Sequence, residues 1–101
     1  MTLRRTKIVA TLGPATSSPE RIAALIDAGM NVARLNFSHG PADEHRERAR
    51  LVREIARDKG THVALLGDLQ GPKIRIARFS EGKIQLDVGD HFRLSTSHPL
   101  D

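Results

Sequence analysis

Three short apolar runs, separated by two helix-like segments, constrain the fold of this 101-residue chain more than any other feature. The runs are "KIVATL" (7–12), "NVARLNFS" (31–38) and "HVALLGDLQ" (62–70), and each is typical of a strand. Their spacing is close to the roughly 30 residues of two parallel strands joined by a crossover helix. The pattern therefore predicts an α/β fold with three parallel strands, of which the first is buried and the third is buried on both faces.

Two helices are predicted between these strands. The first begins after Ser17 or Ser18, carries Pro19 in its first turn and ends at Gly29. The second runs from about residue 42 to 59. The residues expected to face the core are Ile22, Leu25 and Ile26 in the first helix and Ala49, Val52, Ile55 and Ala56 in the second.

The pattern changes after Arg75. Residues 83–95 alternate apolar and polar side chains around a turn at Gly89 and Asp90, which is typical of half-exposed antiparallel strands. We therefore expect one domain over residues 1–76 and the start of a second over 77–101. Because three parallel strands cannot close an eight-stranded barrel, we also expect the chain to be an N-terminal fragment.

The charge and composition narrow the classes of protein to which this chain can belong. The net charge is +4, and much of the excess lies in "EHRERARLVREIARDKG" (44–60), where Glu44–Arg48, Glu47–Arg50 and Glu54–Arg57 are spaced as helical ion pairs. This segment is either a solvated helix face or a nucleic-acid patch, and the scarcity of aromatic residues argues against the patch. The chain has no Cys, no long apolar run and no signal peptide, so we expect a cytoplasmic protein without contact to a membrane.

Polar side chains follow the second and third strands. Alternation places Arg34, Asn36 and Ser38 on one face of the second strand, while Asp68 ends the third. One interpretation is structural, with Asp68 pairing Arg34 or Arg75 and the other polar groups capping the next helix. The other is functional, because the carboxyl ends of parallel strands meet at one edge. There, oxygen ligands suit a hard cation, and Arg34, Lys73 and Arg75 suit phosphate.

Other candidate motifs are weaker. His39 and His45 lack the spaced His or Cys partners of a metal site. The segment "TLGPATSS" follows a strand but lacks the glycine and lysine pattern of a nucleotide-binding loop.

Three segments together resemble the beginning of pyruvate kinases. They are "RRTKIVATLGPATSS", "GMNVARLNFSHG" and "LLGDLQGPKIR", and the likeness covers roughly residues 4–95. The resemblance implies a TIM (β/α)8 barrel with a small β-barrel domain inserted after the third strand. It also implies a glycolytic, homotetrameric enzyme that uses Mg2+ to transfer the phosphoryl group of phosphoenolpyruvate to ADP, giving pyruvate and ATP.

The same resemblance implies roles for individual residues. Arg34 is similar to the arginine that binds the substrate phosphate. The implied ligands of a monovalent cation are Asn36, Ser38, Asp68 and the carbonyl of Leu69, and the implied nucleotide contacts are Asn36, Phe37, Ser38, His39 and Arg75. The catalytic lysine and the Mg2+ ligands of the family come from later strands, so the resemblance predicts no catalytic residue and no activity in these 101 residues alone.

Lys73 departs from the pattern of potassium-dependent relatives. They tend to read D-T-K-G-P-E-I-R, whereas this chain reads D-L-Q-G-P-K-I-R, with Lys73 in place of the glutamate. An ammonium about 6 Å from a bound K+ opposes it by roughly 3 kcal/mol at an effective dielectric constant near 20, or about a hundredfold in affinity. We therefore expect Lys73 to substitute for the cation and make K+ dispensable.

The sequence is also compatible with two other functions. The chain could be a non-catalytic βα module that retains only anion or partner binding. It could also be a basic nucleic-acid-binding module, which predicts affinity that falls steeply with salt.

Overall fold

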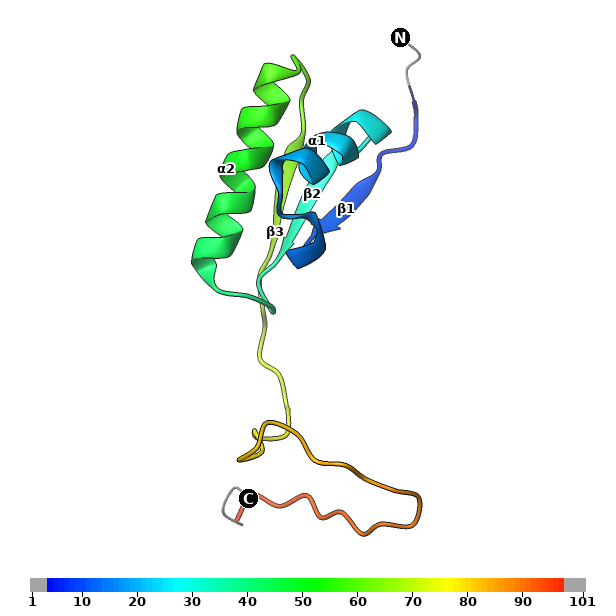
Figure 1. The fold of residues 1–101 in the computed structure, drawn as a ribbon, viewed down its shortest axis with the longest axis vertical. Coiled ribbons are helices and arrows are strands. Elements are labelled where there is room, and N and C mark those ends of the chain that lie inside the picture. Colours follow the sequence, from blue (N-terminus) through cyan, green and yellow to red (C-terminus); the bar gives the residue numbers. More distant parts are fainter. Residues whose placement is uncertain (1–3, 98–101) are drawn as a thin grey trace. The chain divides into compact units, whose positions relative to one another are not determined.

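The computed structural model describes residues 4–97 and divides the chain into two compact units, residues 1–71 and 72–101. All helices and strands of the described residues belong to the first unit (Figure 1). Their order is β1 (Val9–Leu12), the short 3-10 helix η1 (Pro14–Thr16), α1 (Pro19–Ala28), β2 (Val32–Asn36), α2 (Ala42–Asp58) and β3 (Ala64–Asp68). The predicted alternation of strands and helices is confirmed.

The three strands form one parallel sheet in the order β1-β2-β3. In its register Arg34 lies between Thr11 and Leu66, and Asn36 lies beside Asp68. Since side chains alternate along a strand, these residues share one face of the sheet. The register therefore gathers the polar strand ends on a single face, as the sequence predicted for β2.

The other face of the sheet carries the hydrophobic core. Both α1 and α2 pack on it, and Ile22 and Val52 are completely buried between helices and sheet. Buried helix positions recur every three or four residues, which is why each helix buries a single stripe. The core consists of Leu12, Ile22, Ile26, Met30, Ala33, Leu35, Leu51, Val52 and Ala56, with Leu25, Ala49 and Ile55 partly buried against it.

The expected burial of β1 and of both faces of β3 is wrong. Val9 in β1 is 53% exposed and Leu66 in β3 is 41% exposed. Both lie on the face opposite the core, which neither helix covers. The apolar composition of the two strands therefore corresponds to a sheet with one packed face and one open face.

The helix ends follow the predicted signals at α1 but not at α2. Ser18 caps α1 by accepting a hydrogen bond from the Arg21 amide at 3.3 Å, and Gly29 ends it with φ of 116°. The residue before α2 is Pro41, which makes no side-chain cap. Over residues 4–97, neither helix is long and apolar enough to cross a membrane.

The charges of α2 divide between a solvated face and a buried position. Arg50 is exposed and bonds both Glu47 and Glu54, so the predicted Glu54–Arg57 pair is replaced by Glu54–Arg50. The hydrogen bond from Arg50 lowers the pKa of Glu47. The predicted Glu44–Arg48 pair forms at 3.4 Å, but the Arg48 side chain is only 6% exposed. The expectation of a wholly solvated helix face is therefore wrong at Arg48.

The second unit contains turns but, over its described residues 72–97, no strand. Hydrogen bonds close turns at Phe79–Gly82 and Asp87–Asp90, and Gly89 has φ of 94°, so the predicted turn is present. The expected antiparallel pairing around that turn is not formed in this unit, because two short strands without a third are only marginally stable. The domain boundary between residues 76 and 77 stays a prediction.

Candidate functional site

An ion pair between β2 and β3 dominates the open face of the sheet. Arg34 donates from Nε and Nη2 to one oxygen of Asp68, Oδ2, at 3.1 and 2.5 Å. Its Nη1 donates to the Thr11 hydroxyl of β1 at 3.0 Å. The structural interpretation of Asp68 as the partner of Arg34 is thus confirmed, and the guanidinium is held across all three strands.

This arrangement leaves Arg34 able to bind an anion. Its side chain is 31% exposed, and the three bonds use three of its five N–H groups. Among the described residues nothing bonds the other two, so these donors are available to a phosphate or carboxylate oxygen. Asp68 restricts the direction in which they can point, because it fixes the Nε side of the guanidinium.

The residues after β2 form a tight turn. The Asn36 side-chain oxygen accepts from the Ser38 amide at 3.0 Å, and the His39 amide donates to the Asn36 carbonyl at 3.2 Å. The Phe37 amide donates to the Asp68 carbonyl at 3.0 Å, which ties this turn to the end of β3. The turn thereby brings four of the five predicted nucleotide contacts together, namely Asn36, Phe37, Ser38 and His39.

Two of the four predicted cation ligands are neighbours in the sheet. Asn36 and Asp68 are register partners, and their oxygens are of the type that binds a monovalent cation. The Asn36 side-chain oxygen also accepts a hydrogen bond from the Ser38 amide, and Asp68 pairs with Arg34. The cation ligands stay a prediction. Leu69 is 78% exposed beyond β3. Within residues 4–97 no three His, Cys, Asp or Glu side chains cluster as a metal site.

Lys73 and Arg75 belong to the second unit, beyond Pro72. Their predicted places beside the cation and the nucleotide therefore stay predictions.

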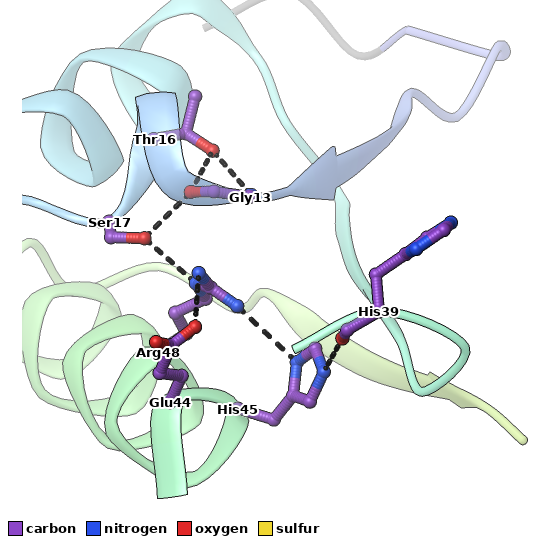
Figure 2. A network of polar contacts seen from close by, with 7 residues as sticks. All are labelled: Gly13, Thr16, Ser17, His39, Glu44, His45 and Arg48. Carbon is purple, nitrogen blue, oxygen red and sulfur yellow. Dashed lines mark hydrogen bonds and ion pairs between the residues drawn. The ribbon is translucent and has the colours of Figure 1, made fainter. Parts of the chain in front are cut away.

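A buried polar network lies beside these strand ends (Figure 2). Arg48 of α2 donates from Nε to the Ser17 hydroxyl at 2.8 Å, and that hydroxyl donates to the Gly13 carbonyl at 2.6 Å. Arg48 also contacts Nδ1 of His45 at 3.5 Å, and Nε2 of His45 bonds the His39 carbonyl at 2.6 Å. His45 and Arg48 are 3% and 5% exposed. The network joins α2 to the loops that follow β1 and β2.

The partners of His45 assign its tautomer. Because a guanidinium can only donate, Nδ1 must accept from Arg48, and because a carbonyl can only accept, Nε2 must donate to His39. Both ring nitrogens are therefore engaged with protein groups. His45 is a structural link between α2 and the turn after β2.

A pocket of about 250 Å3 lies over this network, between the ends of β1 and β2. Its lining includes two predicted nucleotide contacts, Asn36 and His39, together with Arg48. The remaining lining residues are Thr11, Leu12, Gly13, Pro14, Gly40, Glu44 and His45. A larger hollow of about 590 Å3 near the start of β3 contains no predicted site residue. The smaller pocket is therefore the candidate ligand site.

Sequence reasoning did not identify Arg48 or Ser17 as part of the site. The signal for Arg48 was nonetheless present, because His45, Arg48 and Val52 are spaced by three and four residues and so share one face of α2. Val52 was predicted to face the core, and Arg48 lies one turn before it. Ser17 carried no comparable signal, since its hydroxyl was equally suited to capping α1.

Comparison with known proteins places the chain in a family. It matches the model for the barrel domain of pyruvate kinase over residues 3–101. It is 58% identical over 95 residues to pyruvate kinase II of Salmonella typhimurium and 56% identical over 97 residues to a pyruvate kinase of Haemophilus influenzae, covering 94% and 96% of this chain. The crystal structure of Cryptosporidium parvum pyruvate kinase superimposes with a TM-score of 0.73 and 41% identity over 79% of this chain.

The chain spans 20% of the length of these two bacterial relatives and 17% of the Cryptosporidium chain.

The turn after β2 rests on a close contact with β3. The Phe37 ring packs against the His45 ring with centroids 4.8 Å apart. A Cβ atom on Gly67 would lie 3.0 Å from Cε2 of Phe37, closer than carbon atoms normally approach. Gly67 therefore provides the space in which Phe37 sits.

We predict that Gly67→Ala destabilises the full-length protein by about 1–3 kcal/mol, because the Phe37 ring must shift to make room for the added methyl group while it is packed against His45. The measurement is the midpoint of thermal unfolding. Gly13→Ala is the matched control at the end of β1, since nothing lies within 4 Å of its added Cβ. Equal midpoints for the two variants would show that Phe37 does not depend on Gly67.

Proposed function

This chain belongs to the pyruvate kinase family, and on that premise we propose that the full-length protein transfers the phosphoryl group of phosphoenolpyruvate to ADP. With the uptake of one proton the products are pyruvate and ATP. The proposal is carried by Arg34, a partly exposed arginine held by Asp68 and Thr11 near the carboxyl end of β2, in a chain whose family match spans residues 3–101. A cytoplasmic, glycolytic homotetramer is part of the same proposal.

In the proposed reaction Arg34 binds the phosphate of phosphoenolpyruvate. Phosphoryl transfer needs positioning and neutralisation of negative charge, and a guanidinium fixed on two sides supplies both. Asp68 and Thr11 hold the guanidinium on the open face of the sheet, and its side chain is partly exposed there. Mg2+, when bound by residues outside this chain, would neutralise further charge on the phosphates.

The proposed nucleotide site is the pocket between the ends of β1 and β2. Asn36 and His39 line it, and Phe37 and Ser38 belong to the same turn. Arg75 is the fifth residue that we propose to contact the nucleotide. The pocket lies beside the Arg34 face, since Thr11 both lines the pocket and accepts from Arg34. Donor and acceptor phosphates would therefore meet at one edge of the sheet.

The open face of the sheet supports a complete barrel in the full-length protein. Val9 and Leu66 expose apolar side chains there, and β1 and β3 are both edge strands. Further barrel strands would cover the apolar residues and satisfy the edges. We propose that residues 1–76 are the beginning of this barrel and that 77–101 begin the inserted β domain.

We predict that the full-length protein forms pyruvate and that the 101-residue chain alone does not, because no catalytic lysine or Mg2+ ligand is expected in it. The measurement is a lactate-dehydrogenase-coupled assay of both purified proteins. Pyruvate formation by the 101-residue chain would contradict the predicted dependence on later strands. An inactive full-length protein would instead favour a βα module that only binds.

We predict that Arg34→Lys lowers kcat/KM for phosphoenolpyruvate about tenfold to a hundredfold, as expected for the loss of charge-assisted hydrogen bonds. A lysine keeps the charge but cannot bond Asp68, Thr11 and a phosphate from one planar group. The control is Arg21→Lys on the exposed side of α1. A kcat/KM for Arg34→Lys equal to that of the control would exclude Arg34 from substrate binding.

We propose that Lys73 substitutes for the monovalent cation and predict that the full-length enzyme is active without K+. Kinetics in tetramethylammonium buffer, with and without added KCl, are the measurement. Lys73→Glu is expected to create a K+ requirement, because the reversed charge then attracts the ion. An absolute K+ requirement of the unmodified enzyme would refute the role of Lys73, whatever the variant does.

A further inference from the structure

We propose that Arg48 is a positioning residue that sets the width of the nucleotide pocket from beneath, through Ser17 on one wall and His45 on the other. This inference rests on the proposed function, because it concerns the same pocket. Arg48 lies on α2 and is not among the site residues that the sequence motifs or the family resemblance predict.

The first link runs from α2 to the loop after β1. Arg48 Nε donates to the Ser17 hydroxyl at 2.8 Å, and the same hydroxyl donates to the Gly13 carbonyl at 2.6 Å. Thr16 adds a second bond to this segment, since its hydroxyl accepts from the Gly13 amide at 2.8 Å. Gly13 and Pro14 form one wall of the pocket, so Arg48 holds that wall through Ser17.

The second link runs from α2 to the turn after β2. Arg48 contacts Nδ1 of His45, whose Nε2 donates to the His39 carbonyl at 2.6 Å. His39 and Gly40 belong to the opposite wall of the pocket. As Figure 2 shows, the guanidinium lies between Ser17 and His45, so one planar group spans the floor from wall to wall.

The Arg48 guanidinium is buried although its charge is only partly compensated. The Arg48 side chain is 6% exposed, and its one carboxylate partner, Glu44, is 3.4 Å away and 54% exposed. Because the nearby carboxylate offsets only part of the cost of burying the Arg48 charge, this ion pair alone would add little to the stability of the protein. Each of its three nitrogens instead contacts a different group, namely Ser17, His45 and Glu44. Contacts in several directions from one planar group hold those groups at a fixed separation.

Replacement of Arg48 should weaken the binding of the nucleotide but not the binding of phosphoenolpyruvate. Within residues 4–97 Arg48 makes no hydrogen bond to Arg34 or Asp68, which form the proposed phosphoenolpyruvate site, or to Thr11, which lines the pocket and supports Arg34. Loss of Arg48 would let the two walls move relative to each other. Arg34 would keep its bonds to Asp68 and Thr11, since these are made by strands alone.

The test compares steady-state kinetics of the full-length enzyme and its variants. Arg48→Met is expected to raise KM for ADP about tenfold, because the displaced walls would bind ADP less well, with kcat and KM for phosphoenolpyruvate within about twofold. The matched control is Arg50→Met, an exposed arginine of the same helix, which should leave all three parameters unchanged. A role in stability alone would lower the thermal midpoint and the active fraction but not change KM for ADP.

Ser17→Ala keeps the test decisive if Arg48→Met does not fold. It removes the bridge to Gly13 without touching the pocket lining and should also raise KM for ADP selectively. An unchanged KM for ADP in Ser17→Ala, or an equal rise of both KM values, would overturn the inference. An inactive unmodified enzyme would contradict the proposed function instead, and calorimetric titration of ADP into the same proteins would then decide the role of Arg48.

Discussion

The hydrophobic contact between one face of the parallel sheet and the two helices determines where every other group lies. Leu12, Ala33 and Leu35 are buried under α1 and α2, and alternation along the strands then turns Thr11, Arg34 and Asn36 to the opposite face. A shift of register by one residue would bury the guanidinium in the core. The apolar contact therefore determines which polar residues lie on the open face, although the core residues do not contact them.

The polar face depends in turn on the parallel direction of the strands. In a parallel sheet the carboxyl ends of neighbouring strands meet, so Asp68 arrives beside Asn36 and within reach of Arg34. The ion pair is half exposed, which limits what it adds to stability. Its value is directional, because Asp68 binds Nε and Nη2 and so fixes the orientation of the Arg34 guanidinium.

Local patterns predicted the helices, the strands and the Arg34 face, because periodicity and capping are short-range signals. The burial of β3 was overestimated because apolar composition does not reveal how many layers cover a sheet. Arg48 was missed for a similar reason. Its spacing from Glu44 is that of any surface ion pair, and only its place one turn before Val52 distinguishes it from Arg50. Contacts between distant segments, such as Arg48 with Ser17, leave no local pattern.

The buried arginine also shows why packing alone does not explain the pocket. A leucine at position 48 would fill much of the same space without the cost of removing a charge from water. It could not, however, orient the Ser17 hydroxyl towards Gly13 or hold His45 in the tautomer that donates to His39. Hydrophobic contacts hold α2 against the sheet, but they are non-directional. The loops after β1 and β2 need directional bonds to stay in place, and a buried guanidinium supplies them from one position.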